Sequence, residues 1–70
     1  MLDQARLRSI AQAAEQDDWG AAGDEYLELR LGAQEVRDRF AVESLAPALR
    51  LRDSKQLAGI VEQILGEPRS

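Results

Sequence analysis

A chain of 70 residues has room for one domain, and a domain of this size buries only about 60% of the surface that its unfolded form exposes, so its core must be compact. The sequence contains no cysteine and no histidine, which removes disulfides, thiolate chemistry, and the commonest general base and metal ligand. The net charge of −4 argues against nucleic acid as a partner, because nucleic-acid binding depends on lysine and arginine side chains that neutralise phosphates.

Helix-forming residues fill the chain and β-branched residues occur singly, so the sequence predicts an all-α fold in one domain, a small bundle of three to four helices. The first helix is expected at about residues 3–15. One of its faces would be buried, formed by Leu7, Ile10, Ala11 and Ala14. Residues 16–23 are interpreted as a loop or a broken turn, because two aspartates and two glycines interrupt the apolar pattern there.

A long second helix is expected at about residues 24–40. Apolar side chains recur along it at spacings of three and four residues, which predicts one buried stripe. The stripe comprises Ala22, Tyr26, Leu29, Ala33, Val36 and Phe40. Because the stripe extends back beyond residue 24, a start as early as Trp19 is the alternative.

The second half of the chain predicts two further helices. A short helix is expected at about residues 46–51, with Pro47 in its first turn, where a missing N–H does no harm. Its core residues would be Ala48, Leu49 and Leu51. The last helix is expected at about residues 54–65, capped by Asp53 or Ser54. Its apolar face would consist of Leu57, Ile60, Val61 and Ile64, and residues 67–70 are expected to be disordered.

This order of helices (long, long, short, long) in an acidic chain of this size resembles the acyl carrier proteins and the related peptidyl carrier domains. Three segments carry the resemblance: the acidic, glycine-containing residues 17–23, the charged end of the second helix at residues 37–43, and the short helix followed by a capped one. The resemblance covers about residues 17–65. It implies that Phe40 is buried and that the acidic start of the second helix, as far as Glu28, docks onto basic protein surfaces.

The reactive residue of those carriers is missing. They hold a phosphopantetheine arm on the serine of an Asp-Ser-Leu type of triplet, and the matching residues here are Glu25, Tyr26 and Leu27. A tyrosine phenol is larger and more acidic than a serine hydroxyl, so the resemblance implies a carrier-like module without a cofactor. Ser44 stands in a similar triplet, but too few residues follow it for the three remaining helices, and it is interpreted as the cap of the short helix at about residues 46–51.

A second resemblance is weaker. The run from Asp18 to Ala22, followed by Tyr26, is similar to the second helix of a tetratricopeptide repeat. One such repeat cannot bury its own apolar face, and the chain contains no second copy. This interpretation therefore ranks below the carrier resemblance.

The candidate protein-binding residues are Trp19, Asp24, Glu25, Tyr26 and Glu28. Tryptophan and tyrosine often anchor interfaces, because they bury a large area with few rotatable bonds. Trp19 is expected to be an exposed anchor, whereas Tyr26 is expected to face the core or to be half-buried. The carboxylates near the turn do not have the spacing of a calcium loop, so they are interpreted as solvated caps and not as metal ligands.

The sequence thus predicts a non-catalytic docking module, without cofactor or metal, that binds another protein with a basic surface. Two alternatives remain: a functional carrier, whose phosphopantetheine is attached at an unrecognised or substituted serine, and an unrelated small acidic adaptor or inhibitor. No long apolar run or signal peptide is evident, so a cytoplasmic location without a membrane partner is expected. A homodimer is left open, because an exposed Trp19 would lie beside a thin core.

Overall fold

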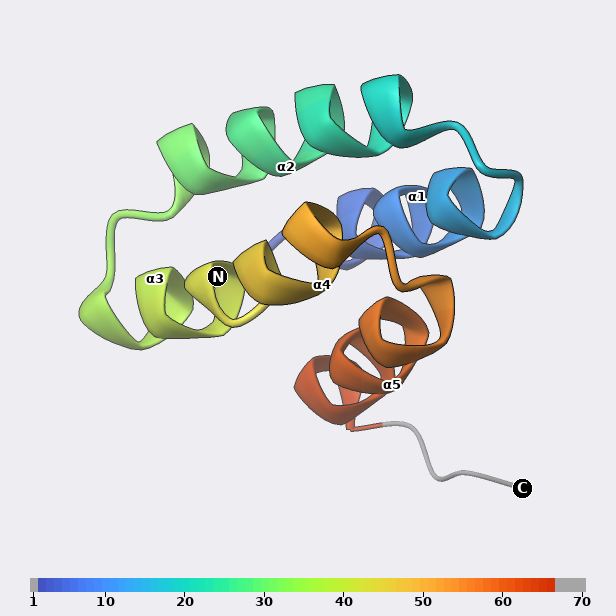
Figure 1. Ribbon diagram of the computed structural model, residues 1–70. Coiled ribbons are helices and arrows are strands. Elements are labelled where there is room, and N and C mark those ends of the chain that lie inside the picture. Colours follow the sequence, from blue (N-terminus) through green and yellow to red (C-terminus); the bar gives the residue numbers. More distant parts are fainter. Residues whose placement is uncertain (1, 67–70) are drawn as a thin grey trace.

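Five helices account for most of residues 2–66, which are the residues that this computed structural model describes (Figure 1). They are α1 (Gln4–Glu15), α2 (Trp19–Gly32), α3 (Val36–Glu43), α4 (Ala46–Leu51) and α5 (Ser54–Leu65). The prediction of a small all-α bundle is confirmed. The prediction for residues 67–70 lies outside the described residues.

Aspartate side chains begin three of these helices. Asp3, Asp18 and Asp53 each accept a hydrogen bond from the backbone N–H three residues further on, at 3.1–3.2 Å. Each bond satisfies one of the N–H groups that the first turn of a helix leaves without a partner. The starts of α1, α2 and α5 therefore follow from local sequence, and Asp53 is the cap of the last helix.

The expected loop at residues 16–23 is wrong, and so is the helix expected at residues 24–40. α2 begins at Trp19, the earlier of the two starts considered, because Asp18 caps it there. The connection from α1 shrinks to residues 16–18, in which Asp17 adopts a positive φ of 60° and reverses the chain. α2 then ends at Gly32, because glycine has a poor helix propensity and the backbone of Ala33 is extended. Residues 33–35 separate α2 from α3.

This break changes which side chains of the expected stripe are buried. Ala22, Leu29 and Ala33 lie in the core, but Val36 and Phe40 are 73% and 74% exposed, so their predicted burial is wrong. Because α3 has its own axis, it presents a different face to the core and buries Val42. Leu45, in the turn that follows, is fully buried.

The helices pack in a closed arrangement. α2 lies along the top of Figure 1 with α1 beneath it, and α3 and α4 follow each other below α2. α5 packs against both α4 and α1, so that the last helix returns to the first. The largest fully buried side chains of the described residues come from four parts of the chain: Leu7, Ile10, Val42, Leu45 and Leu57.

The predicted apolar faces of the first and last helices are confirmed. Leu7, Ile10 and Ala14 of α1 are buried, as are Leu57 and Val61 of α5. The other predicted members, Ala11, Ile60 and Ile64, are half-buried against the same cluster.

In α4, Ala48 is buried as expected, but Leu51 is 71% exposed, because it lies on the last turn and points away from the core. Within residues 2–66, no helix has the length and apolar character needed to cross a membrane.

Candidate protein-binding surface

The five predicted binding residues all lie on α2, but the helix distributes them over different sides. Asp24 and Glu28 are exposed, whereas Trp19, Glu25 and Tyr26 are half-buried. Tyr26 packs against the core, which confirms the prediction made for it. The five side chains therefore do not form one continuous surface.

Trp19 is not the exposed anchor that the sequence suggested. Its ring packs against the buried cluster, and its Nε1–H donates a hydrogen bond of 2.6 Å to Oδ1 of Asp17. The correction follows from the helix start: as the first residue of α2, Trp19 is held beside α1 by the short turn. Its indole stabilises that turn through a carboxylate that the same turn supplies.

Glu25 is occupied by a contact within the molecule. Its Oε2 lies 3.4 Å from Nη1 of Arg6 on α1, and both side chains are about one-third exposed. An ion pair with this exposure contributes about 0.2–1 kcal/mol, so it joins α1 to α2 without dominating their packing. Glu25 is therefore less available to a partner than Asp24 or Glu28.

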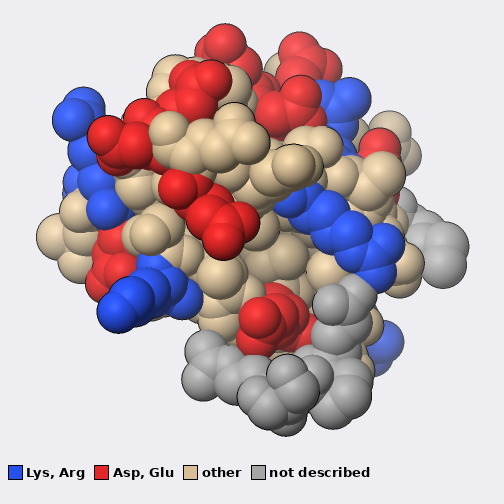
Figure 2. Space-filling model, turned by 90° about the vertical axis from the view of Figure 1, so that its right-hand side faces the viewer, with Lys and Arg blue, Asp and Glu red and all other residues tan. Residues whose placement is uncertain are grey.

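Acidic side chains do gather at the start of α2. Figure 2, which shows the side of the molecule at the right of Figure 1, has acidic side chains over its upper part, where α2 begins. Glu15, Asp17, Asp18 and Asp24 are all exposed. Within the described part of the chain, no three carboxylates approach closely enough to hold a metal ion. The described residues at this end of the molecule thus form an acidic face in which no group of carboxylates could bind a metal ion.

The outer face of α2 combines charge with apolar area. Asp24, Leu27, Glu28 and Leu31 follow one another at the i, i+3, i+4, i+7 spacing that places side chains on one side of a helix. Leu27 is 53% exposed and Leu31 is 79% exposed. Large apolar side chains that share an exposed helix face are a feature of binding surfaces.

A groove of about 520 Å³ lies between α2 and α3, lined in part by these leucines. Leu27, Arg30 and Leu31 line one side, and Arg39 and Glu43 line the other. Phe40 follows Arg39 on α3, with its ring exposed. We call this set the α2–α3 surface: Leu27, Arg30, Leu31, Arg39, Phe40 and Glu43.

Sequence reasoning missed the α2–α3 surface because it placed Phe40 in the core. A signal was nevertheless present in the sequence. Leu27 and Leu31 are four residues apart and fall outside the expected apolar stripe, so a second apolar line runs along the same helix. Two apolar lines on one helix indicate that one of them faces something other than the core.

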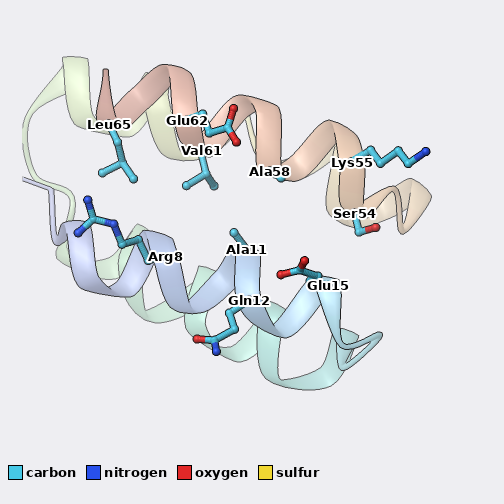
Figure 3. A pocket seen from close by; sticks show the side chains of 10 residues that line it. All are labelled: Arg8, Ala11, Gln12, Glu15, Ser54, Lys55, Ala58, Val61, Glu62 and Leu65. Atoms are coloured by element: carbon cyan, nitrogen blue, oxygen red, sulfur yellow. The ribbon is translucent and has the colours of Figure 1, made fainter. Parts of the chain in front are cut away.

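A larger groove of about 690 Å³ lies between α1 and α5 (Figure 3). Ala11, Val61 and Leu65 contribute apolar atoms to it, and the charged side chains that line it are two basic and two acidic. Arg8 lies at one end of the groove, and Glu15 and Lys55 lie at the other. The balanced charge gives this groove no preference for a charged ligand, and none of the predicted binding residues lines it.

The fold and the α2–α3 surface define a small all-α bundle with an exposed apolar face that charged side chains flank. No protein family, no curated protein and no solved structure matches the chain.

The structure corrects two expectations that came with the carrier resemblance. The long second helix is divided, and Phe40 is exposed instead of buried. Tyr26, at the position matched to the carrier serine, is the eighth residue of α2 and does not stand at a helix start. Ser44 does not cap the short helix α4, whose N-cap is Leu45. It lies instead at the end of α3, where its hydroxyl donates a hydrogen bond to the carbonyl of Ala41.

Proposed function

We propose that this chain is a non-catalytic protein-interaction module that docks its partner through the outer face of α2 and the adjoining α2–α3 surface. The observation that carries the proposal is the exposure of Leu27 and Leu31 along one groove between α2 and α3. Removing such side chains from water is the main favourable contribution to most protein association. The proposal rests on this surface and does not depend on kinship with carrier proteins.

Charge supports a partner with a basic surface. Asp24 and Glu28 lie on the same exposed side of α2 as the two leucines, so a partner that covers the leucines also meets these carboxylates. Complementary charge at the edge of an apolar contact raises the association rate and selects the partner. Of the five residues predicted from sequence, Asp24 and Glu28 are thus the two retained as direct contacts, while Trp19, Glu25 and Tyr26 hold α2 in position.

Affinity capture with matched variants tests this function. The wild-type protein is immobilised beside the variant L27S/L31S, and proteins of a cell extract that bind each are identified. The control is L51S, which removes a leucine of α4 that is 71% exposed and lies outside the α2–α3 surface. We expect bound protein on the wild type and on L51S and its loss from L27S/L31S. Equal recovery on all three would contradict the proposal, provided that circular dichroism shows each variant to be folded.

A further inference from the structure

We infer that the α2–α3 surface is completed by a second copy of this chain, in a two-fold dimer in which the two α2 helices run parallel. This inference rests on the proposed function and names its partner. Leu27 and Leu31 would lie at the centre of the contact, facing the same residues of the other copy. The charges on the two sides of these leucines carry the argument.

The side of α2 that faces α1 is acidic. Glu28 lines a small hollow together with Arg6 of α1 and with Leu2 and Asp3, which directly precede α1, and this fixes the side on which Glu28 lies. Asp24 is one helical turn earlier on the same outer face and is also exposed. We call Asp24 and Glu28 the acidic flank.

The side of α2 that faces α3 is basic. Arg30 lines the groove between α2 and α3, opposite Arg39 and Glu43. This basic flank therefore carries two arginines and one glutamate. Glu28 and Arg30 are two residues apart, and residues at that spacing point to different sides of a helix, so the leucine pair lies between two flanks of opposite charge.

Symmetry decides how these flanks meet in a dimer. A two-fold axis parallel to α2 places the acidic flank of each copy against the basic flank of the other, so the pairing of Glu28 with Arg30 occurs twice. An axis perpendicular to the plane of two antiparallel α2 helices places like flanks together, with acidic against acidic and basic against basic. Like charges in contact oppose association, so the charge pattern selects the parallel arrangement. A two-fold interface of this kind uses the same patch on both copies.

The net charge of −4 on each copy opposes any association of this chain with itself. At about 0.15 M salt, charges further apart than about 8 Å are largely screened, whereas contacts between adjacent flanks are much less affected. The dimer is therefore measured at that ionic strength.

Sedimentation equilibrium of four proteins tests the inference: the wild type, E28R, R30E and the double variant E28R/R30E. In the parallel dimer, each single variant places like charges together at two symmetric sites and should weaken dimerisation at least about tenfold. The double variant exchanges the two flanks and restores both contacts, so its dissociation constant should return to within about threefold of the wild-type value. In an antiparallel dimer, the double variant would still face like with like.

The leucine variants make the outcome decisive. L27S/L31S should be monomeric between about 1 µM and 1 mM, and L51S should dimerise as the wild type does. A wild-type chain that stays monomeric over this range overturns the dimer, and the docking function stands if L27S/L31S still loses its captured protein. A dimer that persists in L27S/L31S overturns the inference that these leucines form the dimer contact, and the docking function is then decided by the capture comparison alone. A double variant no tighter than the single variants overturns the parallel arrangement.

Discussion

Arg52, at the end of α4, has a left-handed backbone conformation, with φ 54° and ψ 44°. A side chain with a Cβ atom is disfavoured there, whereas glycine adopts this conformation readily. We expect R52G to raise the free energy of unfolding by about 0.5–1 kcal/mol relative to R52A, since both variants lose the charge and only one loses Cβ. Urea denaturation followed by circular dichroism measures this difference.

Gly66 allows the reverse substitution, in which a Cβ atom is added at a residue that already has a left-handed backbone conformation. It ends α5 with φ 72°, so G66A forces a Cβ atom into the same backbone region and should lower the free energy of unfolding by about 1 kcal/mol. If R52G and R52A were equally stable, the left-handed conformation of residue 52 would be wrong. Either result concerns the backbone at one residue, because neither substitution removes a core contact.

Single residues also explain how much of the fold could be predicted. Asp18 caps the start of α2, but the alternative start at Trp19 was inferred from the apolar stripe that extends back to Ala22 and not from this cap. The exposed position assigned to Trp19 could not be corrected from sequence. Its partial burial depends on the positive φ of Asp17, which brings the start of α2 back against α1.

At the scale of elements, α1 and α5 were predictable because one apolar line, one aspartate cap and a clear end coincide in each. The boundary between α2 and α3 was not predictable, because the apolar spacing continues from Leu29 through Ala33 to Val36 without interruption. Such a spacing does not show where the helix axis changes direction. The break at residues 33–35 is decided by packing: α3 must turn back beneath α2 for Val42 and Leu45 to enter the core. The exposed surface was missed for the same reason.

A pair of substitutions tests this division of the second helix. L45A removes a fully buried side chain and should lower the free energy of unfolding by about 2–5 kcal/mol. F40A removes an exposed ring and should change it by no more than about 0.5 kcal/mol. An undivided helix with a buried Phe40 predicts instead a loss of about 3–5 kcal/mol for F40A. Chemical denaturation of the two variants under one set of conditions distinguishes the arrangements.

At the scale of the whole molecule, the closed packing separates this chain from an open stack of helical repeats. α1 and α2 form an antiparallel pair joined by a short turn, and the start of α2 is the segment that was compared with the second helix of a tetratricopeptide repeat. In an open stack each repeat contacts only the repeats next to it in the chain, so the first and last helices stay apart. Here α5 packs against α1. The single core is thus closed, and the exposed leucines of α2 and the exposed Phe40 of α3 lie outside it.

The same arrangement predicts how the whole chain responds to the chemistry of carrier proteins. A transferase that loads phosphopantetheine needs an accessible serine hydroxyl at the start of the recognised helix. The residue that the carrier resemblance matches to that serine is Tyr26, which is half-buried in the middle of α2. We therefore expect the intact mass to remain unchanged after incubation with coenzyme A and a promiscuous transferase, with a working carrier protein as the positive control. Y26S should also remain unmodified, because its new hydroxyl would stay in the middle of a helix that packs against the core. A gain of one arm by the wild type would instead make the chain a carrier, and a gain by Y26S alone would mean that the surface around α2 retains carrier character despite its division from α3.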